Sequence, residues 1–254
     1  MKNQRRENTD LQGLKLLAKV FLSYEPVKTK FSPMIVKHPF TDSGIVGIRT
    51  DDGGYGYANL MDNQADMDKW REHMEQRIDN IGDASGIFML ITKPYALGFF
   101  KHAAQHLGRD DFARILAYTW IRTEAPNSDP NLSKSKLLTL FKSADPQILM
   151  DEDEYQQFLS LPDKVTVYRG VTPYNAGNVK ALSWTLNRKT AEWFSQRFGE
   201  QGTVYQATVD KKHIYALFTG RNESEVIVDP KHLEGLEQIH QFTPPEQTMK
   251  GMEL

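Results

Sequence analysis

Three short motifs in the last third of the chain combine residue types that can bind an anion and stabilise a developing positive charge. Val167-Tyr168-Arg169-Gly170 supplies an arginine, Leu182-Ser183-Trp184-Thr185 supplies two hydroxyls, and Glu223-Ser224-Glu225 supplies two carboxylates. An arginine offers a planar, permanently charged fork for phosphate or ribose oxygens. A carboxylate stabilises positive charge that develops beside it in a transition state. The set therefore combines an anion-binding group with groups that can stabilise positive charge.

Each motif also has an ordinary structural interpretation. An arginine at a strand end is usually solvated or salt-bridged, alternating hydroxyls often form one polar strand face, and a Glu-x-Glu pair is common at a solvated edge. None of the motifs predicts a function alone. Their order along the chain, in a region of predicted strands, carries the functional interpretation.

In that order, the motifs resemble those of the Arg/Ser-Thr-Ser/Glu-x-Glu class of mono-ADP-ribosyltransferases. This class includes bacterial toxins, phage-encoded host-modifying enzymes and vertebrate ecto-enzymes. The resemblance covers residues 163–232. It implies a strand-rich core that binds NAD as a substrate, transfers its ADP-ribose to a side chain of a target protein and releases nicotinamide.

The resemblance also implies a role for each motif residue. Arg169 holds NAD, Ser183 positions the nicotinamide ribose, and Thr185 stands where the family has a second hydroxyl. Glu225 matches the catalytic carboxylate. Glu223 matches the residue that orients or deprotonates the nucleophile, and in the family a glutamate here accompanies arginine as the acceptor. Because alternate residues of a strand project to the same side, we expect both carboxylates to face one cleft.

Two further residues, Phe194 and Arg197, follow Ser183 at a spacing comparable to that of two NAD-contacting residues in some toxin members. Those members place a nicotinamide-stacking aromatic residue and a second phosphate-binding arginine there. The segment 190–198 is equally typical of an amphipathic helix. Phe194 then belongs to the core face and Arg197 to the solvated face, and the sequence leaves both interpretations open.

The chain departs from the family pattern at two points. Trp184 and Thr185 stand where many members have Thr and Ser, and a strand would turn Trp184 away from Ser183 toward the core. The segment 218–222 is short for a target-recognition loop, in which Arg221 and Asn222 are the candidates for contacts with the acceptor.

Other chemistry-bearing patterns favour structural roles. His102 and His106 have the spacing of metal ligands on a helix, but that turn contains no acidic residue to complete a zinc motif. Solvated or core histidines are therefore the better interpretation, and no metal is expected. Gly53-Gly54 suits a hairpin turn better than a phosphate loop, because no strand-to-helix context surrounds it.

The elements that position these residues change in type along the chain. Apolar spacing predicts helices before residue 161 and, within 31–61, a hairpin; beyond Asp163 short strands dominate. The turn-rich segment 125–133 is the best linker candidate. The predicted helices span 9–24, 62–81, 85–107 with a break near Pro94, 109–124, 135–144, 151–161 and 190–198, and the predicted strands span 45–48, 55–60, 165–169, 181–186, 203–209, 213–218 and 225–228.

Composition limits the remaining function classes. The 254 residues are 39% hydrophobic and 25% charged, with a net charge of −2, which is ordinary globular composition. Scattered basic residues disfavour a nucleic-acid partner. The chain has no cysteine, so thiol catalysis and cysteine-based zinc sites are excluded. Neither the segment 14–22 nor 86–100 suits a signal peptide or a membrane span.

We therefore expect an α+β protein with a mostly helical region over 1–160 and an ADP-ribosyltransferase-like β core over 161–254. The expected activity is transfer of ADP-ribose from NAD to an arginine of a target protein, by a soluble cytoplasmic protein or one delivered into a host cell. Two alternatives stay open: NAD glycohydrolysis at the same site, and a non-catalytic interaction protein that acts through its helical region.

Overall fold

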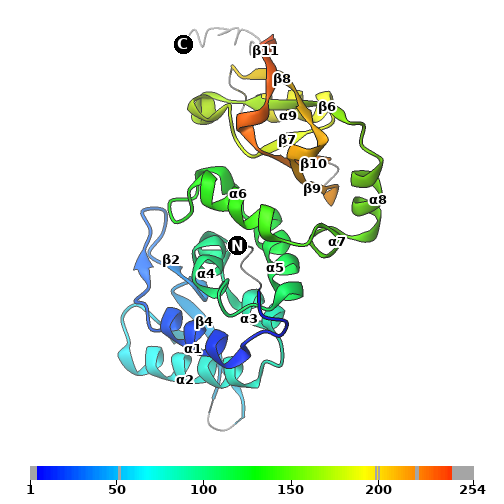
Figure 1. Cartoon of the computed structure of the whole chain (residues 1–254). Helices are drawn as coiled ribbons and strands as arrows, with labels where there is room; N and C mark the ends of the chain where they lie inside the picture. Colours follow the sequence, from blue (N-terminus) through cyan, green and yellow to red (C-terminus); the bar gives the residue numbers. More distant parts are fainter. Residues whose placement is uncertain (1–4, 51–52, 198, 200, 221–222, 242–254) are drawn as a thin grey trace, which may run out of the picture. The chain divides into compact units, whose positions relative to one another are not determined.

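The computed structural model describes residues 5–50, 53–197, 199, 201–220 and 223–241 (Figure 1). The chain divides into two compact units, Met1–Ser133 and Lys134–Leu254. This division falls at the end of the predicted linker 125–133, whereas the sequence suggested a change at residue 160. The helices between residues 134 and 160 therefore belong to the second unit.

Helices dominate the N-terminal unit, and their apolar faces meet in an aromatic core. Phe21 and Phe88 both contact Phe99 edge-on, with ring centroids 5.0 Å apart in each pair. The predicted break near Pro94 is confirmed by a short 3-10 turn, Lys93–Tyr95. The helices are α1 (Leu11–Leu22), α2 (Gln64–Asn80), α3 (Ala84–Leu90), α4 (Ala96–Ala103) and α5 (Arg109–Arg122), followed by the 3-10 turn Pro126–Ser128.

The same unit contains two small antiparallel sheets within the segment predicted to be extended. The predicted hairpin is confirmed, since β4 pairs with β5 from Ile45↔Asn59 to Arg49↔Tyr55. Part of its predicted turn, Asp51 and Asp52, lies outside the described residues. The strands are β1 (Val27–Lys28), β2 (Ile35–His38) and β3 (Thr41–Ser43) in one sheet, and β4 (Ile45–Arg49) and β5 (Tyr55–Asn59) in the other.

The C-terminal unit opens with three helices, two of which the sequence predicted. The acidic run at residue 151 begins α8 through a capping box: Glu154 N donates to Asp151 Oδ1, and Asp151 N donates to Glu154 Oε2. The helices are α6 (Lys134–Ser143), α7 (Pro146–Leu149) and α8 (Glu152–Ser160), and α9 (Arg188–Gln196) follows later in the chain.

A six-stranded sheet forms the rest of this unit, with strand order β11-β8-β6-β7-β10-β9. Its strands are β6 (Lys164–Val171), β7 (Ser183–Thr185), β8 (Thr203–Asp210), β9 (Ile214–Phe218), β10 (Glu225–Val228) and β11 (Glu234–Gln241), with 3-10 turns at Pro173–Asn178, Lys211–His213 and Pro230–His232. The sequence did not predict β11, because this edge strand has no buried residue and so lacks apolar alternation. The α+β class, helices first and the large sheet last, is confirmed.

Among the residues that the structure describes, none of the helices combines the length and apolar character that crossing a membrane requires.

Candidate functional site

The three sequence motifs lie on three neighbouring strands in the middle of the sheet. Arg169 is on β6, Ser183 and Thr185 are on β7, and Glu225 begins β10. One cross-strand row joins the three strands: Tyr168, the residue before Arg169, pairs with Thr185, and Thr185 pairs with Glu225. Residues separated by about 40 positions in the chain thus share one small region of the sheet.

Arg169 is held at the β6–β7 junction by a backbone acceptor. Its Nη1 donates to the carbonyl oxygen of Ser183 at 2.6 Å. Its Nε has no accessible surface and no hydrogen-bond partner among the described residues. Burial lowers the pKa of Arg169 to about 10, while the charge of Glu225 acts in the opposite direction. The guanidinium therefore stays cationic at neutral pH, within electrostatic reach of Glu225.

Ser183 and Thr185 share one face of β7 but differ in what their hydroxyls do. Thr185 is buried, and its Oγ1 donates to the carbonyl oxygen of Glu223 at 2.6 Å and accepts from Asn187 N at 3.0 Å. It therefore anchors the chain just before β10. The half-buried Ser183 hydroxyl contacts no hydrogen-bonding group in the described part of the chain, so a ligand can use it. Trp184 is buried, as expected.

Glu223 and Glu225 do not share a strand face in the way the sequence suggested. Strand β10 begins only at Glu225, and Ser224 has a left-handed backbone with φ of 44°. Strand alternation therefore cannot relate the two carboxylates. Glu223 instead stands in the turn before the strand, where the Thr185 hydroxyl holds its backbone. Both glutamates are half-buried, and the neighbouring candidates Arg221 and Asn222 lie outside the described residues.

Helix α9 packs against the strand that carries Arg169, and Gly170 permits the close approach. A Cβ on Gly170 would overlap the carbonyl oxygen of Ala191 and lie 2.7 Å from Ser195 N and 2.9 Å from Phe194 Cβ. Ala191 and Ser195 form the buried face of α9, while Phe194 is half-buried. The structure therefore brings Phe194 next to the Arg169 region.

Arg197 and Trp193 are exposed at the C-terminal end of α9. The Arg197 guanidinium lies over the Trp193 ring, 5.9 Å from its centroid, and the Trp193 and Phe194 rings are 5.0 Å apart. Trp193 is thus not a core residue, although it belongs to the segment whose spacing predicted an amphipathic helix. Phe198 lies outside the described residues.

Glu154 lies outside the three motifs, and the structure gives it a role beyond the start of α8. Its side chain is buried, and Oε1 accepts from Thr219 N at 2.7 Å while Oε2 accepts from Asp151 N. Thr219 directly follows β9 and begins the segment that leads to Glu223. Glu154 thereby fixes the start of that segment from α8. The capping-box spacing was a sequence signal for Glu154, but it did not indicate the contact with Thr219.

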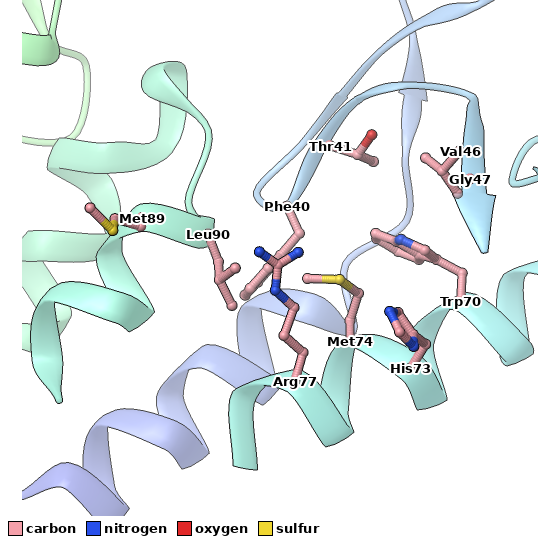
Figure 2. Close-up of a pocket in the computed structure, with 10 residues that line it drawn as sticks. All are labelled: Phe40, Thr41, Val46, Gly47, Trp70, His73, Met74, Arg77, Met89 and Leu90. Atoms are coloured by element: carbon pink, nitrogen blue, oxygen red, sulfur yellow. The ribbon is translucent and has the colours of Figure 1, made fainter. Parts of the chain in front are cut away.

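The described residues contain no group of three or more His, Asp or Glu side chains that could hold a metal ion. His106 Nδ1 lies 3.0 Å from Asp10 Oδ2, and His102 contacts the ring of Phe21, so both histidines have structural partners. Two recesses, of about 320 and 400 Å³, lie in the N-terminal unit, and Figure 2 shows the first of them. Neither is lined by the residues that the motifs singled out.

Comparison with known proteins gives no relative: no family model, no curated protein and no solved structure matches the chain. We therefore infer the function from the residues of the chain and their geometry.

Proposed function

We propose that the C-terminal unit binds NAD and transfers its ADP-ribose to an arginine side chain of a target protein. One observation carries the proposal: Arg169, Ser183 and Glu225 lie on adjacent strands, with Arg169 bonded to the Ser183 backbone. The same three residue types in the same order define the motif class that the sequence resembles.

The charges of the site support binding of the dinucleotide. Arg169 keeps its positive charge at neutral pH because its pKa is about 10. Its guanidinium can pair with a pyrophosphate or ribose oxygen. The Ser183 hydroxyl can donate to a ribose oxygen, and the half-buried ring of Phe194 offers a surface for stacking.

The carboxylates support the transfer step. Cleavage of the bond between ribose C1′ and the nicotinamide nitrogen leaves positive charge on the sugar, and nicotinamide departs with the bonding electron pair. Glu225 can stabilise that charge, which exists only as the bond breaks, and so raise the rate as well as the affinity. A nitrogen of the acceptor arginine then bonds to C1′ and loses a proton. Glu223, two residues before Glu225, is the candidate base that accepts this proton.

The proposal is tested with purified protein, NAD and agmatine, a small molecule that carries the guanidinium of arginine. Nicotinamide release and ADP-ribosyl-agmatine are measured for the wild-type protein and for Glu225→Gln and Glu223→Gln. We expect Glu225→Gln to abolish both products. Glu223→Gln should retain nicotinamide release but lose transfer to agmatine.

A matched control is Glu237→Gln on strand β11, an exposed glutamate whose side chain accepts a long hydrogen bond, of 3.4 Å, from Gln206 Nε2. It should behave as the wild type. Free ADP-ribose without ADP-ribosyl-agmatine would identify a glycohydrolase. The absence of saturable NAD binding would favour the non-catalytic alternative.

A further inference from the structure

The N-terminal unit contains a recess with an apolar wall. Helix α2 contributes the buried side chains of Trp70 and Met74, the strand region contributes the buried Phe40, and α3 contributes Leu90. The recess has a volume of about 320 Å³, which is enough for a small ligand with one ring or branched chain. This wall lies in a different unit from the three motifs, so it needs its own explanation.

Two side chains with N–H donors border the same recess. Figure 2 shows His73 and Arg77 rising from α2 on the same side as Trp70 and Met74. Both are exposed, and they are one helical turn apart. Within the described residues, Arg77 has no hydrogen bond or ion pair, so its planar fork of donors is available to a ligand.

A second recess extends this surface along α2. It has a volume of about 400 Å³, shares His73 and Arg77 with the first, and adds Gln76, Asn80 and Ile81. His73 and Arg77 therefore stand where the two recesses meet. A ligand with an apolar body and an anionic end matches this arrangement.

Four of the five acidic residues of α2 lie on a different side of the helix from Arg77, and the fifth, Asp66 in the first turn, accepts from Asn59 N at 2.8 Å. Asp79 faces α1, where its carboxylate accepts from Lys19 Nζ at 2.8 Å and its carbonyl oxygen accepts from Lys15 Nζ at 2.7 Å. No aspartate or glutamate is among the described residues that line either recess. The charge at the recess is therefore positive. The acidic row follows helical spacing and comprises Asp68, Glu72, Glu75 and Asp79.

We propose that this recess binds a small monocarboxylate that carries one aromatic or branched aliphatic group. The carboxylate accepts a bidentate pair of hydrogen bonds from Arg77, with His73 as a second donor. The apolar group packs against Phe40, Trp70 and Met74, where it loses contact with water. This binding is independent of the activity proposed for the C-terminal unit.

The test uses 3-phenylpropionate as the probe, with its neutral amide as an isostere that lacks the charge. The full chain is labelled at the methionine methyl carbons, because Met74 and Met89 both line the recess. Their NMR signals, assigned with Met74→Leu and Met89→Leu, report binding at this place. We expect saturable shifts of both signals with a Kd on the order of 1 mM. The amide should bind at least about tenfold more weakly than the acid.

The Arg77→Gln variant should weaken 3-phenylpropionate binding about tenfold or more, and Arg77→Lys should weaken it less because the charge remains. Arg114→Gln is the matched control: an exposed arginine of α5 in the same unit, outside the lining of either recess. It should bind as the wild type does. Unchanged binding by a folded Arg77→Gln protein, equal binding of acid and amide, or no saturation at Met74 and Met89 would each overturn the proposal.

Discussion

Arg169 and Ser183 are joined by a hydrogen bond of 2.6 Å from the guanidinium Nη1 to the backbone oxygen. The acceptor belongs to the main chain, so it persists whatever side chain stands at residue 183. The bond links β6 to β7 and orients the guanidinium before any ligand arrives. Such preorganisation reduces the entropy lost on binding and favours a defined geometry for an anionic group.

Replacing Arg169 should weaken NAD binding most when the substitution removes both the positive charge and the planar set of N–H donors. We expect Arg169→Ala to raise the Kd for NAD about tenfold or more, and Arg169→Lys to raise it less, since a lysine keeps the charge but not the fork. Titration calorimetry measures both. Arg188→Ala, at the exposed start of α9, serves as the control. An Arg169→Ala protein that stays folded and binds NAD as tightly as the wild type would contradict the role given to Arg169.

Substitution of Gly170 should disturb the packing of α9 against β6. A methyl group at residue 170 would overlap the Ala191 carbonyl oxygen. We expect Gly170→Ala to lower the free energy of unfolding by about 1–3 kcal/mol, measured by urea unfolding. At Gly177 an added Cβ has no neighbour within 4 Å, so Gly177→Ala should change stability little. Equal stability of the two variants would show that α9 does not pack as described.

Glu154 should be intolerant of even an isosteric change. Its two carboxylate oxygens accept from Thr219 N and Asp151 N, and an amide replaces one acceptor by a donor that would face an N–H group. We expect Glu154→Gln to cost about 1–3 kcal/mol of unfolding free energy. Asp153→Asn, one residue earlier and exposed, is the control. If both variants unfold at the same urea concentration, Glu154 does not anchor the segment after β9.

His38 should make the stability of the N-terminal unit depend on pH. Burial lowers its pKa below the ordinary value of 6.5, and the ring is held neutral, with Phe40 N donating to Nδ1 and Nε2 facing the Tyr24 oxygen. The unfolded chain therefore takes up a proton first as the pH falls. The stabilisation is present above pH 6.5 and is lost below it.

Urea unfolding at a series of pH values checks this expectation for His38. The wild-type protein should lose stability between about pH 7 and pH 5, and His38→Gln should show a shallower dependence in that interval. The same slope in both proteins would assign the pH dependence to other groups.

Local patterns predicted most of the helices and the strands that carry the motifs, because apolar spacing and capping residues are local signals. Strand pairing is not local: the sequence placed Thr185 and Glu225 on strands without indicating that they are direct partners. The edge strand β11 was missed because it buries nothing.

Contacts of single residues in the site likewise could not be predicted from local sequence patterns. The expectation for Glu223 assumed an unbroken strand, and the left-handed backbone of Ser224, a non-glycine residue, could not be foreseen. The buried contact between Glu154 and Thr219 depends on how α8 lies against β9, which no spacing within α8 encodes. The recess beside Arg77 likewise depends on which elements pack around α2.

The role of Glu225 is tested most directly by the rate of nicotinamide release from NAD by the wild-type protein and by Glu225→Gln, with agmatine present and NAD binding measured in parallel. We expect a loss of about 100-fold or more in the variant, since a group that stabilises the transition-state charge has been removed. NAD binding and the unfolding transition should change little. Equal rates in the two proteins, both folded, would contradict the catalytic role of Glu225.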